Sequence, residues 1–217
     1  MSKKYTAEIL GTFILVFSGC GAAVVNDVRE GMISHAGVAL VWGMVVMSLI
    51  YALGDISGAH INPAVTIGFW VAKRFEAKYV IPFIVCQCIG ATMAAIFLKI
   101  LFPDHPTLGS TLPYDGSVWQ SFVLEVVLSF MLMFVILCVS SGAKEKGIMA
   151  GAAIGSVVGF EAMFGGPISG ASMNPARSMG PAIISGNTQH LWIYLVATIL
   201  GMLAAVPICQ LICNGDD

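Results

Sequence analysis

A ten-residue segment occurs twice in this chain and constrains its fold more than any other feature. The first copy, residues 57–66, reads SGAHINPAVT, and the second, residues 169–178, reads SGASMNPARS. Six of the ten positions are identical, and the last differs only as Thr against Ser. In each copy a Ser-Gly turn leads to Asn and then Pro, which is typical of a helix start with Asn at the N-cap and Pro at the first helical position. The repeat therefore predicts two helices that begin in the same way.

Both predicted helices are too short to cross a membrane. Helix-breaking residues follow at Lys73-Arg74 in the first copy and at residues 185–187 in the second. Each helix then has about 10–12 residues and a length of about 15–18 Å, half of a bilayer core of about 30 Å. We expect both helices to enter the membrane without crossing it.

The rest of the chain is apolar enough for a membrane protein. Of its 217 residues 58% are hydrophobic and 10% are charged, too few polar side chains to cover a soluble globule. The chain passes straight into its first apolar run, so we expect a retained span and no cleaved signal peptide. A net charge of −2 gives no reason to expect a nucleic-acid partner. Six stretches reach spanning length: residues 5–25, 35–54, 79–102, 118–141, 147–165 and 189–213.

The order of these segments predicts an inverted repeat. Two spans, a half-spanning helix and a third span occur twice, over residues of about 1–105 and about 118–217. An odd number of spans in each half places the two boxes on opposite faces of the membrane. Arg29 and Lys99 fall on one side, and most other basic residues fall on the other, which predicts that both termini are cytoplasmic. The residues predicted on the cytoplasmic side are Lys3, Lys4, Lys73, Arg74, Lys78, Lys144 and Lys146.

The doubled Asn-Pro-Ala box, with Arg177 directly after the second copy, carries a family resemblance. The chain resembles the aquaporin (major intrinsic protein) family over essentially its whole length, and within it the nodulin-like intrinsic proteins and their bacterial relatives. The resemblance implies an all-α integral membrane fold with six transmembrane helices and two re-entrant half-helices, forming one channel domain over residues 1–217. It also implies a homotetramer in the plasma membrane, with one pore per subunit, small neutral solutes and the lipid bilayer as partners, no enzymatic activity and no cofactor.

Asn62 and Asn174 are predicted to form the central constriction of such a pore. Half-helices that meet end to end bring two positive dipole ends and two Asn side chains to the middle of the membrane. Each Asn oxygen can cap its own helix, which leaves the amide NH2 group as a donor toward the passage. The loops before the boxes, residues 54–61 and 165–173, are expected to offer carbonyl acceptors, because unwound backbone at this depth must face water or protein. This wall suits small neutral molecules and disfavours ions.

The resemblance also implies a selectivity filter of four residues. By their spacing to the boxes, the positions correspond here to Trp42, Ala162, Ala171 and Arg177. A Trp opposite two alanines, with one guanidinium, indicates a wide and apolar aperture for glycerol, or for undissociated acids such as boric and arsenous acid, besides water. Water-selective members of the family carry His at the position of Ala162, so this chain differs from them there. Ser178 and Ala182, which follow the filter Arg, instead resemble the residues that water channels carry at these positions. Trp42 is alternatively an interfacial anchor.

Two carboxylates lie at matching places in the first and fourth spans. Glu8 begins the segment EILGTF, and Glu125 begins the similar segment EVVLSF. A carboxylate within a span must face the protein interior and accept hydrogen bonds. The resemblance implies that each braces the loop before one box, with a proton relay as the alternative. Glu161 has no counterpart in this pattern, and a hydrogen bond to the loop 165–173 is its expected role, with a subunit contact or pore lining as alternatives.

The remaining chemistry-bearing residues point to packing. The six cysteines lie in or beside apolar segments without a cluster of His or carboxylates, so we expect small apolar packing residues and no metal site. His60 is expected in the pore wall or packed in its loop, and His35 and His190, near the extracellular edges, are candidate pH gates.

Three other functions stay open at this stage. A mainly water-selective channel has the same boxes. An ion-coupled transporter also uses inverted repeats, but it needs titratable groups at the midplane, for which Glu8, Glu125 and Glu161 are the candidates. An adhesive or scaffolding membrane protein is disfavoured by the short loops and tails.

Overall fold

The structure, a computed structural model, describes the backbone of residues 3–140 and 144–213, without side chains at 144–147 and 213. The side chains of Lys144 and Lys146, which were predicted to lie on the cytoplasmic side, are therefore not described. The described backbone has α-helices and one 3-10 turn, η1 (Tyr114–Gly116). The helices are α1 (Lys3–Val28), α2 (Ser34–Ser57), α3 (Pro63–Val71), α4 (Ala77–Leu101), α5 (Val118–Val139), α6 (Lys144–Ser169), α7 (Pro175–Ser185) and α8 (Leu191–Cys213).

Six of these helices are long and apolar enough to cross a membrane, within the residues described. The other two, α3 and α7, have 9 and 11 residues and begin at the repeated Asn-Pro steps. This confirms the predicted fold class of six spanning helices with two half-spanning helices between them.

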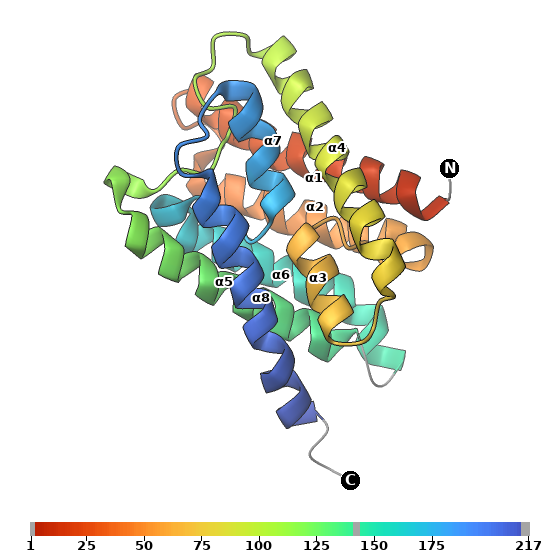
Figure 1. The fold of residues 1–217 in the computed structure, drawn as a ribbon. Coiled ribbons are helices and arrows are strands. Elements are labelled where there is room, and N and C mark those ends of the chain that lie inside the picture. Colours follow the sequence, from red (N-terminus) through yellow and green to blue (C-terminus); the bar gives the residue numbers. More distant parts are fainter. Residues whose placement is uncertain (1–2, 141–143, 214–217) are drawn as a thin grey trace.

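The helix contacts form corresponding pairs, because each contact made by a helix of the first half has a counterpart made by the matching helix of the second half. Helix α1 packs on α4 as α5 packs on α8, and α3 contacts α8 as α7 contacts α4 (Figure 1). The halves meet along α2 and α6 and at the facing ends of α3 and α7. Each half-helix thus packs against a spanning helix of the opposite half, as expected for an internal twofold repeat.

Two glycines at matching places allow the closest of these helix contacts. A Cβ atom on Gly90 in α4 would overlap the Ile9 carbonyl oxygen of α1, and one on Gly201 in α8 would overlap the Val126 carbonyl oxygen of α5. Apolar lipid does not drive helices together, so close backbone approach at small residues is a main source of their association. These glycines fix the spacing within each half.

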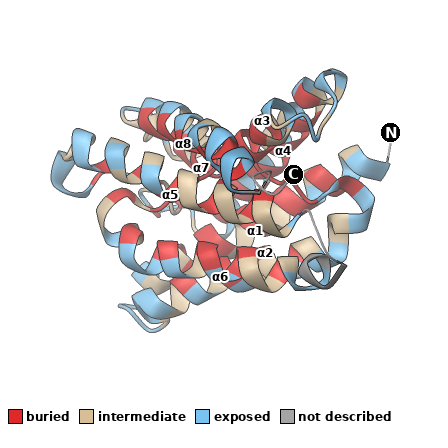
Figure 2. Ribbon diagram, turned by 90° about the horizontal axis from the view of Figure 1, so that it is seen from below, coloured by how far each residue is buried: buried red, intermediate tan, exposed pale blue. Residues whose placement is uncertain are grey.

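The surface of the bundle is apolar where a bilayer would cover it. Large hydrophobic side chains are exposed on the outer faces of the spanning helices, among them Leu40, Met44, Ile81 and Val123. Figure 2 shows the buried residues on the faces that the helices turn toward one another. Exposed apolar area of this extent is typical of lipid contact. The chain is a multi-pass integral membrane protein.

The cysteines lie within the helices, with Cys20, Cys86 and Cys209 buried. In the part of the chain that the structure describes, no group of three His, Cys, Asp or Glu side chains is placed to hold a metal ion.

The helices before the boxes run further than the sequence indicated. The second and fifth spans were predicted to end at residues 54 and 165, but α2 continues to Ser57 and α6 to Ser169. Gly58 and Gly170 then end these helices with φ of 89° and 85°, the left-handed conformation that glycine adopts without strain. Their N–H groups donate to the carbonyls of Gly54 and Gly166, both at 2.9 Å. Ser-Gly is therefore a helix end here and not the middle of a loop.

Candidate functional site

The two half-helices meet at their N-termini, and an Asn caps each one. The Asn62 Oδ1 atom accepts from the Ala64 N–H at 2.9 Å, and the Asn174 Oδ1 atom accepts from the Ala176 N–H at 3.0 Å. Both residues have extended backbone and are followed by Pro at the first helical position. The cap geometry is that expected of an Asn-Pro helix start.

The amide groups of the two Asn residues cross between the halves. Asn62 Nδ2 donates to the Met173 carbonyl at 2.7 Å, and Asn174 Nδ2 donates to the Ile61 carbonyl at 2.9 Å. From the sequence, both N–H groups of each Asn amide were expected to point into the passage. One N–H of each amide is instead used to join the two loops, and one remains to face the lumen.

Glu8 holds the loop before the first box. Its Oε1 atom accepts from the Ser57 hydroxyl at 2.6 Å and from the His60 N–H at 3.0 Å. Its Oε2 atom accepts from the Ile61 N–H at 2.7 Å and from Gln87 Nε2 at 2.8 Å. The carboxylate is fully buried, so these donors replace the water that it has lost.

Glu125 repeats the arrangement in the second half. Its Oε1 atom accepts from the Ser169 hydroxyl at 2.7 Å and from the Ser172 N–H at 2.8 Å, and its Oε2 atom accepts from the Met173 N–H at 2.9 Å. Both carboxylates therefore make the contacts that a bracing role requires.

The braced loops contain strained backbone. Ala59 and Ile61 have φ of 47° and 43°, and Ala171 and Met173 have φ of 41° and 53°. The left-handed conformation is unfavourable for residues with a side chain, above all for a β-branched one such as Ile61. In both loops the carboxylates of Glu8 and Glu125 accept from residues in this conformation, at the N–H groups of Ile61 and Met173.

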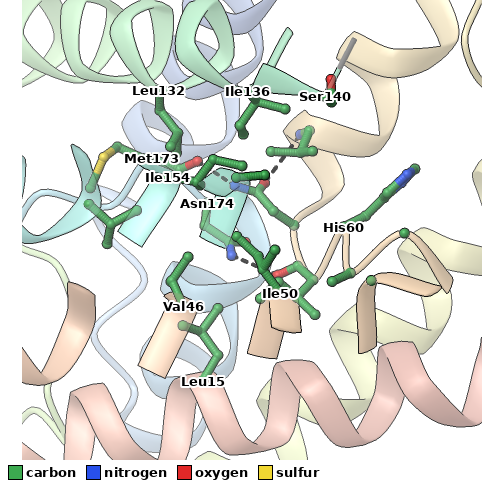
Figure 3. A pocket seen from close by; sticks show the side chains of 18 of the residues that line it. Leu15, Val46, Ile50, His60, Leu132, Ile136, Ser140, Ile154, Met173 and Asn174 are labelled. Atoms are coloured by element: carbon green, nitrogen blue, oxygen red, sulfur yellow. Dashed lines mark hydrogen bonds between the residues drawn. The ribbon is translucent and has the colours of Figure 1, made fainter. Parts of the chain in front are cut away.

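A cavity of about 740 Å³ lies along these loops. Residues 58–62 and 171–174 line it, with both capping Asn residues among them. Figure 3 shows Asn174 facing apolar side chains, among them Val46, Ile50, Leu132 and Ile154. One side of the lumen is thus polar and the facing sides are apolar.

All four predicted filter residues belong to the wall of this cavity. Trp42, Ala162, Ala171 and Arg177 all line it, and each is at most 8% exposed. The Arg177 Cζ atom lies 4.6 Å from the centroid of the Trp42 ring, a cation–π contact. Trp42 therefore faces the pore and is not an anchor at the membrane surface.

Two glycines that the sequence gave no reason to single out lie against Trp42 and Arg177. A Cβ atom on Gly19 in α1 would overlap the ring of Trp42, so this glycine provides the space in which the ring lies. Gly109, in the loop between α4 and α5, accepts a hydrogen bond from Arg177 Nη1 on its carbonyl at 2.8 Å. Both contacts join residues far apart in the chain, and no local pattern announces them.

The expected role of Glu161 is wrong. Neither carboxylate oxygen has a hydrogen-bond partner among the residues that the structure describes, although the side chain is fully buried. Glu161 is also absent from the wall of the cavity, which Ala162 lines. Consecutive residues on a helix point about 100° apart, so only one of the two can face the lumen.

Of the histidines considered from the sequence, His60 lies in the wall of the cavity and His35 lies in a contact between two helices. His60 lines the cavity, and its Nδ1 atom lies 3.1 Å from the Thr66 hydroxyl while its ring stacks on Phe69. His35 Nε2 lies 2.6 Å from the Met163 carbonyl oxygen and joins α2 to α6.

The described helices in this arrangement, with a cavity lined by both capping Asn residues, define a membrane channel for small neutral solutes. The family model described as Major intrinsic protein matches residues 1–208. This chain belongs to the major intrinsic protein family.

The chain is similar to named plant members of that family. It is 46% identical over 203 residues to aquaporin NIP1-1 of Oryza sativa subsp. japonica, covering 93% of this chain and 71% of the relative. It is 42% identical over 215 residues to nodulin-26 of Glycine max, covering 99% and 79%.

A solved structure shares the fold. The X-ray structure of the aquaglyceroporin from Plasmodium falciparum superposes with a TM-score of 0.86 at 24% sequence identity, covering 98% of this chain and 97% of that one.

Proposed function

We propose that this channel passes glycerol and undissociated acids such as boric and arsenous acid, together with water, and that it excludes ions and protons. The observation that carries the proposal is the composition of the filter. Trp42 stacks on Arg177, and two alanines, Ala162 and Ala171, line the same cavity. Side chains this small leave room for a carbon backbone, and the Trp ring offers it an apolar surface.

A solute with hydroxyl groups finds partners along the whole pathway. Arg177 lines the cavity, and its guanidinium can donate to a solute hydroxyl at the filter. Carbonyls of the two loops and one N–H of each capping Asn continue the polar side, while Val46, Ile50 and Leu132 accommodate the carbon edge. Each hydroxyl can thus exchange one partner for the next without losing all its hydrogen bonds.

Ions lack such partners. An apolar wall does not replace a hydration shell, and the N-terminal ends of α3 and α7 together with Arg177 repel cations. Asn62 and Asn174 both donate toward the lumen, so a water molecule between them accepts from both sides and cannot pass a proton along a continuous chain.

We propose a homotetramer in the plasma membrane, with one pore per subunit, on the basis of the family. The distribution of Lys and Arg supports the placement of both termini in the cytoplasm. Residues 1–217 form one channel domain, with inverted repeats at about 1–105 and about 118–217.

Stopped-flow light scattering of proteoliposomes tests the proposal. Wild-type protein should increase glycerol and boric acid uptake without any ion gradient, and Trp42→Ala should alter the ratio of glycerol to water permeability. Trp119→Ala is the matched control, because that side chain is 73% exposed and lies away from the cavity.

Two results would contradict the proposal. Rapid water flow with no glycerol or boric acid uptake would assign a water-selective channel instead. Uptake that requires a proton gradient would assign coupled transport.

A further inference from the structure

The carbonyl that holds Arg177 lies in a turn that needs support. Leu108 and Gly109 have φ of 52° and 73°, two successive residues in the left-handed region. Leu108 is fully buried, and a Cβ atom on Gly109 would press against Cys20 of α1, whose thiol also donates to the Gly109 carbonyl at 3.6 Å. For Leu108 this conformation is unfavourable unless other contacts hold it.

His105 supplies that support. Its Nδ1 atom accepts from the Leu108 N–H at 3.0 Å and from the Thr107 N–H at 3.3 Å, and its side chain is 5% exposed. An imidazole nitrogen that accepts from N–H groups carries no proton, so the ring proton lies on Nε2. That nitrogen lies 3.4 Å from Asp27 Oδ2 at the end of α1.

We propose that His105 is a positioning residue for the selectivity filter. It folds the turn over residues 105–109 so that the Gly109 carbonyl meets Arg177 Nη1. No other hydrogen bond from the guanidinium is found in the described residues, and the other close contact is the Trp42 ring. Without the Gly109 carbonyl, the guanidinium leans toward Trp42 and narrows the passage. This inference rests on the proposed function of the filter.

The rest of the loop has anchors of its own. Asn187 Nδ2 donates to the Pro106 carbonyl at 2.8 Å, and the Thr111 hydroxyl donates to that of Ser178 at 2.7 Å. Both bonds join the loop to α7 or to the residues after it. Loss of the His105 acceptor should therefore reshape one turn without releasing the loop from the bundle.

The test measures solute flux in proteoliposomes with the same pH on both sides. His105→Leu should lower glycerol permeability about fivefold near neutral pH, which is the effect expected from losing the one hydrogen bond between Arg177 and the Gly109 carbonyl. His105→Asn should restore it, because the Asn oxygen occupies the place of Nδ1 and accepts the same N–H groups. His190→Asn, at a half-buried histidine outside this turn, should leave glycerol permeability unchanged.

The outcomes separate this inference from the proposed function. His105→Leu with wild-type flux, or His105→Asn as impaired as His105→Leu, would overturn the positioning role. If wild-type protein passes no neutral solute, or Trp42→Ala changes nothing, it is the proposed function that fails.

Discussion

Replacing Glu8 by Gln tests whether the buried carboxylates maintain the strained loops. The change keeps the size of the side chain but leaves one acceptor oxygen where there were two, and each oxygen of Glu8 accepts a backbone N–H, that of His60 or that of Ile61. Whichever way the amide is turned, one buried N–H loses its acceptor, which costs about 1–3 kcal/mol. For a chain of this size, each kcal/mol lowers the thermal midpoint by about 2–4 °C, so we expect a decrease of about 2–12 °C.

Glu125→Gln should have an effect of similar size. Its oxygens also accept one backbone N–H each, from Ser172 and from Met173. Glu76→Gln is the matched control, because this glutamate makes an exposed ion pair with Lys78 and should leave the midpoint nearly unchanged.

The midpoints are to be measured in one detergent at one heating rate by tryptophan fluorescence, because unfolding of membrane proteins is often irreversible. Glycerol flux in proteoliposomes gives a second quantity, which should fall as the carbonyls of the loops leave the wall. If Glu8→Gln and Glu125→Gln both unfold at the midpoint of Glu76→Gln, the carboxylates do not maintain the strained loops.

Three further changes test the pore and the packing. Ala162→His should place an imidazole in the filter and reduce glycerol flux at least about tenfold, because the narrowed site rejects the larger solute. Water flux should fall less. Equal losses of both fluxes would argue against a role of Ala162 in selectivity. Gly19→Ala should push the ring of Trp42 toward the lumen and lower glycerol flux more than water flux in the same assay; unchanged flux would show that the ring has space elsewhere. Gly201→Ala should lower the thermal midpoint, because overlap with the backbone of α5 costs about 1–3 kcal/mol or more. Gly21→Ala is the control, because a Cβ atom there meets only an ordinary contact at 3.4 Å and should leave the midpoint unchanged.

The sequence predicted the features that depend on local chemistry. Asn followed by Pro specifies a helix start by itself, so both half-helices and their caps were predictable from the repeat. The six spans follow from the length of their apolar runs, and the matching positions of Glu8 and Glu125 pointed to buried carboxylates with matching roles.

Features that depend on contacts between distant segments were not predictable in this way. Gly109 is 68 positions from Arg177, and Asn62 is 111 positions from the carbonyl to which its amide donates. The helix ends at Ser57 and Ser169 were placed too early, because a Ser-Gly pair is equally typical of a loop and of a helix end. Glu161 was given a hydrogen bond because a buried carboxylate normally needs one, and its surroundings among the described residues do not provide it.

The crossed bonds between the capping amides and the opposite carbonyls have a consequence for biosynthesis. When the ribosome has released only the segment as far as α4, Asn62 and the Ile61 carbonyl lack the groups that later satisfy them. Burying such groups in lipid is unfavourable, so the first re-entrant segment can reach its final depth only after α7 has been translated. Maturation of the channel should therefore end in a single late docking event, in which both halves become complete together.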